Sequence, residues 1–378
     1  EKTKDFNFFK RFDYILFITF MLLSAIGLIV FSSAVKSMNS SMRMLIVQSG
    51  SMAIGLVFFI ILSLIDYKDF KTLGFLVYFF TLSLLVLVLV KGTGDQLGSR
   101  SWIEIFGFSL QPAEFAKITF ILVASIFLER IYDGVKDRAA NIVKFLFYSA
   151  IPIGLVIAQK DFGTSMVFVF VFFVLIFVCG LKYKYILILF GAGAAFAPVA
   201  WQFLNETRRQ RIIVYLYSVI FNTDLDPTKY GYNVKKSKVA IGSGQIFGKG
   251  LYSGFQTQND GVPVKESDFI FSVIGEELGF IGAMVIVALI CVLILRCIYI
   301  AKHSRDSYGM FLVIGITSYL GIHFVENIGM SIGVLPVTGI PLPFVSQGGT
   351  AIMTNFIALG IIMSVSMRRR KVLFNASS

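Results

Sequence analysis

Residues 13–33 read DYILFITFMLLSAIGLIVFSS, an apolar run long enough to cross about 30 Å of hydrocarbon as a helix. Runs of similar character recur along the chain, at about 44–65, 72–90, 111–128, 144–159, 163–180, 185–204, 268–297, 308–330 and 350–367. Backbone polar groups inside a bilayer must be satisfied within the segment, which favours helices. The sequence therefore predicts an all-α polytopic membrane protein with ten transmembrane helices.

The composition supports this fold class. Hydrophobic residues make up 56% of the 378 residues and charged residues 15%, and the mean hydropathy is +0.80. Soluble domains carry roughly 25% charged residues, so an ordinary soluble enzyme is excluded. Three cysteines without CxxC spacing favour neither a disulfide framework nor a zinc site.

The distribution of basic residues predicts the orientation. Lys and Arg gather in the N-terminal arm, in the even-numbered connections and in the tail at 368–371, and are sparse in the short connections on the other side. The positive-inside rule places both termini in the cytoplasm. We expect one multi-pass domain over residues 1–378 in the cytoplasmic membrane. The net charge of +12 then reflects topology and predicts no nucleic-acid partner.

One connection, about 205–267, is long and basic and would lie outside the cell between the seventh and eighth helices. It carries Arg208, Arg209 and Arg211 beside the apolar stretch 212–221, a pattern typical of a helix in the membrane interface. Loops of this length are usually functional or disordered. Its glycine-rich stretch AIGSGQIFGKG (240–250) includes Lys249 and could form a backbone nest for phosphate oxygens, although it lacks dinucleotide-motif spacing.

Ionisable residues at membrane depth are costly and call for a reason. Glu114 and Lys117 have the i, i+3 spacing of an ion pair on one helix face. They can orient two helices, line a cavity for a charged substrate, or do both. His323 and Glu326 have the same spacing, which favours a helix-packing hydrogen bond over a proton relay.

Two aspartates lie where outer loops enter helices. Asp161, in QKDFGTS, is as consistent with a carboxylate at a helix N-terminus as with a site residue. Asp268 directly follows the long basic loop. A transferase acting on a pyrophosphate substrate needs cations for the leaving group and a carboxylate that takes a proton from a hydroxyl. From the residues alone, a transporter cavity explains this pattern equally well.

Five motifs in order carry a family resemblance. They are GSRSWIEIFGFSLQPAEFAK (98–117), QKDFGTS (159–165), KVAIGSGQIFGKG (238–250), ESDFIFSVIGEELGF (266–280) and GIPLPFVSQGGT (339–350). This set resembles the SEDS family of bacterial cell-wall polymerases, with branches named RodA, FtsW and SpoVE. The RodA branch, which acts in elongation and cell shape, looks closer than the branches of cell division and sporulation.

The resemblance implies a peptidoglycan glycosyltransferase that polymerises lipid II on the outer membrane face, with a class B penicillin-binding protein as partner. It implies inverting transfer with Asp268 as the catalytic general base. The substrate-binding candidates are Arg100, Trp102, Glu114, Lys117, Asp161, Arg208, Arg211, Lys249, Ser346, Gln347 and Gly348. Two positions depart from the family pattern. Gln347 replaces the usual Tyr of the last motif, and Asn233 replaces the Gln of the GYQ that is common in the long loop.

Two other functions stay open. A lipid II flippase would account for ionisable pairs at membrane depth, although no inverted repeat supports it. A non-catalytic scaffold would predict that Asp268 is replaceable. No cofactor is certain. A divalent cation, Mg²⁺ or Mn²⁺, could share the work on the pyrophosphate, but no cluster of carboxylates argues for a resident metal.

Overall fold

The structure is a computed structural model that describes residues 11–94, 100–105, 108–135, 137–180, 206–221 and 231–369, with isolated positions 187, 191 and 202. Most of these residues are helical. The predicted helix at 185–204 lies outside the described ranges, so this prediction stays untested.

Within the described residues, seven helices are long and apolar enough to cross a membrane. They are α2 (Tyr14–Val35), α3 (Ser41–Leu64), α4 (Phe70–Lys91, preceded by the short helix η1, Tyr67–Asp69), α6 (Arg138–Ala158), α13 (Gly279–Lys302), α14 (Ser307–Ser331) and α15 (Gly349–Met367). The helices α5 (Pro112–Tyr132) and α7 (Phe162–Val178) lie on two further predicted runs. The protein is therefore a multi-pass helical membrane protein.

The predicted run at 268–297 is divided in two. The short helix α12 (Ile270–Glu277) has Leu278 as its C-cap, and α13 begins at Gly279, which has a φ of +70°. A left-handed backbone is accessible to glycine at little cost. A side chain at Gly279 would also meet the backbone nitrogen of Gly248 at 2.2 Å, so the glycine is required both for the turn and for the close approach.

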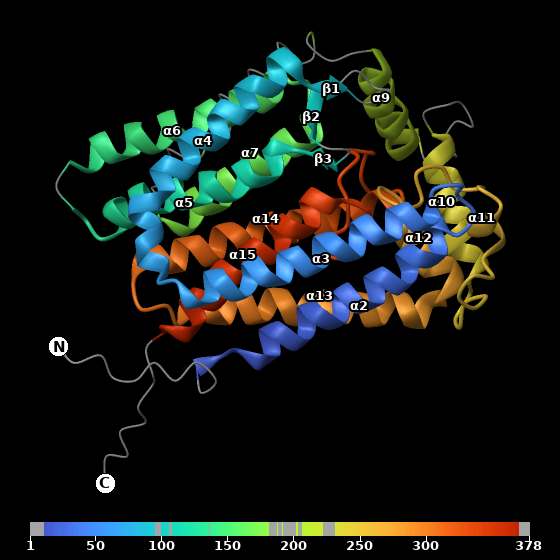
Figure 1. Cartoon of the computed structure of the whole chain (residues 1–378). Helices are drawn as coiled ribbons and strands as arrows, with labels where there is room; N and C mark the ends of the chain where they lie inside the picture. Colours follow the sequence, from blue (N-terminus) through green and yellow to red (C-terminus); the bar gives the residue numbers. More distant parts are fainter. Residues whose placement is uncertain are drawn as a thin grey trace.

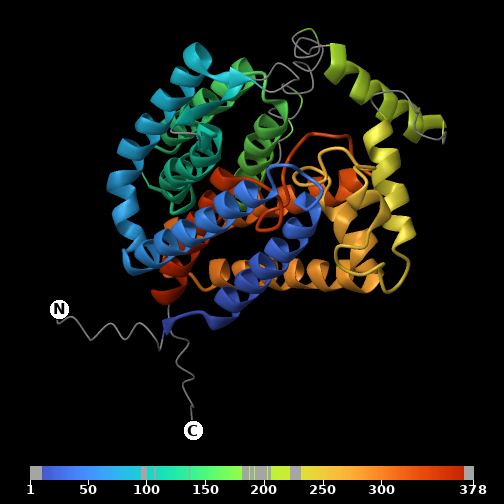
Figure 2. The same ribbon diagram turned by 45° about the vertical axis from the view of Figure 1, so that its right-hand side comes forward.

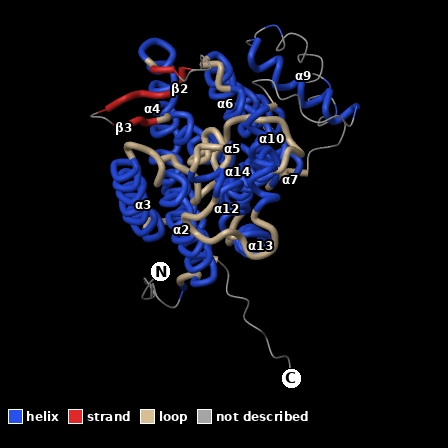
Figure 3. The backbone as a smooth tube through the Cα atoms, turned by 90° about the vertical axis from the view of Figure 1, so that its right-hand side faces the viewer, coloured by secondary structure: helices blue, strands red, loops and turns tan. Residues whose placement is uncertain are grey.

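The all-α prediction misses a small antiparallel sheet between α4 and α5. Its strands are β1 (Thr93–Gly94), β2 (Arg100–Ile105) and β3 (Phe108–Leu110), in the order β1-β2-β3. Ile103 pairs with Leu110 and Ile105 with Phe108 in the hairpin. Figure 3 shows these strands at one end of the molecule, beside the tip of α4. Short strands inside a connection produce no long alternating pattern, so the hydropathy of the sequence did not reveal them.

The centre of the bundle is formed by α5, α14 and α15, whereas α3 and α13 are largely exposed on their outer faces. Figure 1 shows α2, α3, α13, α14 and α15 side by side, with α4 to α7 as a second group. The crossing of α3 and α15 depends on small residues: a Cβ at Gly360 would lie 2.9 Å from the Phe59 carbonyl oxygen. Close backbone approach of this kind is typical of helix packing in membranes.

Asp13 fixes one end of the bundle. It caps α2 and accepts charge-assisted hydrogen bonds from Arg296 of α13, 2.8 Å away, and from Arg369 beyond α15. Burial alone would raise the pKa of Asp13, but the bonds from Arg296, Leu16 and Ser366 hold it below its usual value. The start of α2 and the end of α15 are thereby joined.

The described part of the long connection contains three helices, α9 (Glu206–Phe221), α10 (Tyr232–Ser243) and α11 (Phe255–Gln258), joined to α12 by turns and irregular segments. They lie at the end of the bundle opposite Asp13 (Figure 2), and α10 and α11 contact α12. A side chain at Gly244, just after α10, would clash with the Gly275 carbonyl oxygen of α12. The glycine-rich stretch therefore packs directly on the backbone of α12.

Candidate active site

A cavity of about 820 Å³ lies at this same end of the bundle. Its walls come from α3, α5, α7, α9 and the small sheet, and from the loops that precede α12 and α15. The predicted site residues Trp102, Glu114, Asp161, Asp268, Gln347 and Gly348 all line it. The volume is within the range of ordinary ligand sites, roughly 300–1,000 Å³. The fold thus brings together motifs that are far apart in the sequence.

Asp268 lies on the segment between α11 and α12. The Ser267 hydroxyl lies 3.1 Å from its Oδ1 and donates a hydrogen bond to it. The next residue, Phe269, is buried and forms the N-cap of α12, so the helix starts directly behind the carboxylate. Asp268 therefore presents an acidic group to the cavity from a backbone that is packed on its inner side.

Asp161 lies on another wall of the cavity. Its Oδ1 accepts a hydrogen bond from the Thr164 backbone N–H at the start of α7, and its Oδ2 accepts one from Gln111 Nε2 at 3.0 Å. Burial raises the pKa of the Asp161 carboxyl, and the Thr164 hydrogen bonds oppose that shift only in part. Asp161 is thus both a helix cap and a cavity residue.

We expect Asp161→Asn to preserve the fold and to lower activity modestly. Asparagine caps helices about as well as aspartate, whereas Asp161→Ala should cost about 1 kcal/mol. Loss of one charged contact in the cavity should lower catalytic activity about 2–10-fold. Thermal unfolding in detergent and an activity assay measure the two effects. A complete loss of activity in a folded Asp161→Asn variant would contradict this assignment.

Glu114 and His323 line the floor of the cavity, whereas Lys117, also predicted to bind substrate, does not line it and is hydrogen-bonded to both of them. Lys117 Nζ lies 2.8 Å from Glu114 Oε1, 3.0 Å from His323 Nε2 and 4.7 Å from the centre of the Tyr319 ring. Lys117 is 2% exposed and Glu114 3%. An ammonium group only donates, so His323 accepts at Nε2 and carries its proton on Nδ1. The predicted packing hydrogen bond of His323 is therefore made to Lys117.

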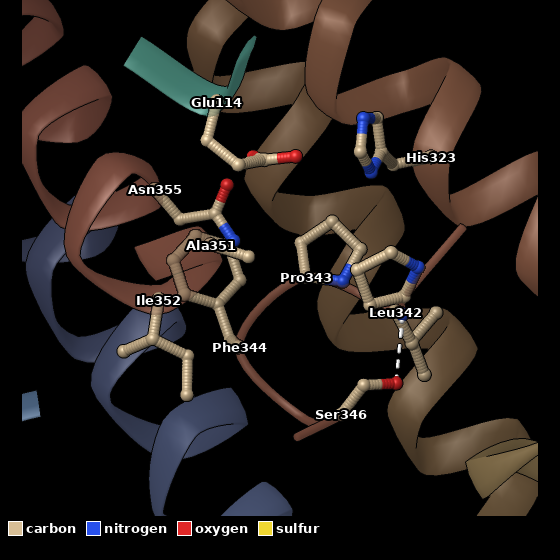
Figure 4. A pocket seen from close by; sticks show the side chains of 10 residues that line it. Glu114, His323, Leu342, Pro343, Phe344, Ser346, Ala351, Ile352 and Asn355 are labelled. Carbon is tan, nitrogen blue, oxygen red and sulfur yellow. Dashed lines mark hydrogen bonds between the residues drawn. The ribbon is translucent and has the colours of Figure 1, made fainter. Parts of the chain in front are cut away.

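A second cavity, of about 10 Å³, borders the floor and is large enough for about one water molecule. Figure 4 shows Glu114, His323, Asn355 and Ser346 around it. Ser346, predicted to bind substrate, is 2% exposed. Its hydroxyl accepts a hydrogen bond from the Leu342 N–H at 2.8 Å and donates one to the Ser267 carbonyl at 2.6 Å. The Ser346 hydroxyl thus connects two loops of the protein.

Lys249 is directed toward α12 instead of the cavity, as far as the described residues show. Its Nζ lies 3.2 Å from Glu276, and the N–H groups of Lys249 and Gly250 donate to the carbonyls of Glu276 and Glu277. Burial alone would raise the pKa of Glu276, but hydrogen bonds from Gln256, Thr257 and Lys249 hold it below its usual value. The backbone groups of the predicted phosphate nest are therefore engaged by the protein itself.

Three predicted arginines have side chains outside the described part. Arg100 belongs to β2, and Arg208 and Arg211 belong to α9. Other residues of α9 line the cavity, namely Ile212, Tyr215 and Leu216. The Tyr215 hydroxyl also donates to the Val334 carbonyl. The structure thus brings the helix that carries two of these arginines to the cavity wall.

Sequence reasoning missed Gln48 and Asn327. Gln48 lies on α3 and is 2% exposed. Its Nε2 donates a hydrogen bond to the Ser346 carbonyl at 3.0 Å, and its Oε1 accepts one from the Gly348 N–H at 3.3 Å. Asn327 lies on α14 and donates to the Asp268 and Ile340 carbonyls. Each is a polar amide inside an apolar run, which was a usable signal.

The family model described as cell cycle protein, FtsW/RodA/SpoVE, matches residues 13–371. The chain belongs to this family. The predicted family membership is therefore confirmed over nearly the whole chain.

Relatives and solved structures of the family agree with this assignment. The chain is 33% identical to "Peptidoglycan glycosyltransferase MrdB" of Escherichia coli K12 over 93% of each chain. It is similar to a chain of a solved peptidoglycan synthase complex that coordinates polymerisation and crosslinking, with a TM-score of 0.77, 28% identity and coverage of 94% and 97%. It is also similar to a solved structure of a mutant of the rod shape-determining protein RodA of Thermus thermophilus. The TM-score is 0.70 and the identity 25%, and the match covers 95% of this chain and 99% of the RodA chain.

Proposed function

We propose that this chain is a peptidoglycan glycosyltransferase that polymerises lipid II on the outer face of the cytoplasmic membrane. The observation that carries the proposal is the gathering of Asp268, Asp161, Trp102 and Gln347 around one cavity of about 820 Å³. The names of the relatives and the family membership support the same activity.

The proposed reaction inverts the configuration at the anomeric carbon of the donor sugar. The 4-hydroxyl of the acceptor sugar attacks C1 of the donor, Asp268 takes the hydroxyl proton, and the bond from C1 to the pyrophosphate oxygen breaks. The pyrophosphate leaves as the anion, so one carboxylate suffices. Arg208, Arg209 and Arg211 are our candidates for the leaving-group clamp. Lys249, already paired with Glu276, is a weaker candidate.

The orientation follows from the basic residues. Both termini would lie in the cytoplasm, which places the cavity end of the bundle outside. We further propose a class B penicillin-binding protein as the partner that crosslinks the strands. The similarity to a complex that coordinates polymerisation and crosslinking supports this partner.

A lipid II flippase is the second candidate function. The buried Glu114–Lys117 pair favours it, because transporters keep ionisable groups at membrane depth. The polymerase explains more of the site, because Asp268 and the loop motifs lie at one end of the bundle and not near its middle.

The deciding experiment supplies purified lipid II to the chain and a partner whose transpeptidase is inactivated. Glycan polymer on a gel supports the polymerase. Absence of polymer, together with transfer of labelled lipid II across vesicle membranes, supports the flippase instead. Parallel reactions with Mg²⁺, Mn²⁺ or EDTA test whether polymerisation requires a divalent cation. Among the described residues, no three His, Cys, Asp or Glu side chains lie close enough to hold a metal ion together.

A further inference from the structure

Asn327 joins the segment that carries Asp268 to the proline-rich loop before α15. It lies on α14 and is fully buried. Its Nδ2 donates to the Asp268 carbonyl at 2.9 Å and to the Ile340 carbonyl at 2.8 Å. One side-chain amide thus holds two separate backbone segments at the cavity wall.

These two contacts determine how the amide of Asn327 is turned. An amide nitrogen has two N–H donors and the oxygen has none, so the reverse orientation would place oxygen against two carbonyl oxygens. The Oδ1 atom is buried without a hydrogen-bond partner among the described residues. A buried acceptor without a partner is costly. A side chain needed only for packing would be apolar here. The two hydrogen bonds that the nitrogen donates therefore account for an amide at this buried position.

Two further contacts join the same segments. The Ser346 hydroxyl donates to the Ser267 carbonyl, and the Gln347 N–H donates to the Glu266 carbonyl at 2.8 Å. Gly339, with a φ of +80°, adjoins Ile340, and a Cβ on it would lie 3.5 Å from Asp268 Oδ2. The backbone of the proline-rich loop therefore runs beside the carboxylate itself.

A general base has to lie about 2.6–3.2 Å from the atom whose proton it takes. A displacement of about 1 Å can cost about 10²-fold in rate. We propose that Asn327 is a positioning residue that sets the location of the Asp268 carboxylate against the proline-rich loop. The inference rests on the proposed role of Asp268. Asn327 acts through the backbone of Asp268 and Ile340 and touches no substrate.

The test is Asn327→Leu, which keeps the approximate size and removes both donors. Steady-state polymerisation of lipid II should show kcat lowered about 10–100-fold, with KM within about twofold. Ser331→Ala is the matched control: it lies one turn further along α14, is fully buried, and its hydroxyl donates to the Asn327 backbone carbonyl. This control should keep the kcat of the unmodified chain.

Ser346→Ala is a second, milder variant of the same connection and should lower kcat severalfold. If both residues hold one carboxylate, the double variant should lose less than the product of the two single losses. An unchanged kcat in Asn327→Leu overturns the inference, as does a rise in KM with kcat unchanged. If Asn327→Leu does not fold, an unchanged kcat in Ser346→Ala overturns it. Polymer from Asp268→Asn would instead overturn the proposed base, which is a separate outcome.

Discussion

Asp268→Asn should abolish polymerisation of lipid II while leaving the chain folded and able to bind its substrate. Asparagine keeps the size of the side chain and can still accept the Ser267 hydrogen bond at Oδ1. It cannot take a proton from the acceptor hydroxyl. General base catalysis contributes about 10²–10⁴-fold, so we expect kcat to fall at least about 10²-fold.

The matched control is Asp260→Asn. Asp260 lies on the same connection, but its side chain is 69% exposed, and asparagine can still accept the hydrogen bond from the buried Lys265 at Oδ1. It should polymerise at the rate of the unmodified chain. Gel analysis of glycan length measures both variants, and retention of labelled lipid II by the purified proteins measures binding. Polymer from Asp268→Asn at a normal rate would remove this residue from the base role and support a structural one.

Lys117→Met should destabilise the protein strongly. Lys117 neutralises Glu114 and donates to His323, and the two charged side chains, Lys117 and Glu114, are only 2% and 3% exposed. Removal of one member of a buried pair leaves an uncompensated charge and costs about 3–5 kcal/mol. We expect a clear decrease in the temperature of unfolding in detergent. Size-exclusion chromatography of samples heated to increasing temperatures measures this decrease.

The double variant Glu114→Gln with Lys117→Met separates the charge from the packing. It removes both charges and should recover most of the lost stability. Lys71→Met is the control for a partly exposed pair, because Lys71 and Glu129 are 35% and 17% exposed, and we expect the loss of this pair to cost about 1 kcal/mol. Equal losses in Lys117→Met and Lys71→Met would show that the floor of the cavity does not depend on its buried charge.

The predicted runs and the family motifs came from local information. A stretch such as 13–33 has to be helical in a bilayer because no water satisfies its backbone, whatever the rest of the chain does. The helices α2, α3, α4, α14 and α15 begin and end within a few residues of the predicted runs. The division of 268–297 at Gly279 was not foreseen, because glycine inside an apolar run also occurs within continuous helices.

The composition of the site was only partly predictable. Glu114, Asp161 and Asp268 stood out as charges at helix ends or at membrane depth, and all three line one cavity. Lys249 stood out as the cation of the glycine-rich stretch, but it is paired with Glu276, whose position depends on how α12 packs against that stretch.

The sequence by itself determined the fold class, the family and the residues capable of acid–base chemistry, because these depend on local apolar length and on motifs read in order. The tertiary structure alone decided which of those residues meet. Hydrogen bonds from Asn327 of α14 to two loops, and from Gln48 of α3 to one of the same loops, join parts of the chain that are remote in sequence. No local pattern specifies such partners, since a buried amide satisfies whichever backbone groups the packing brings to it.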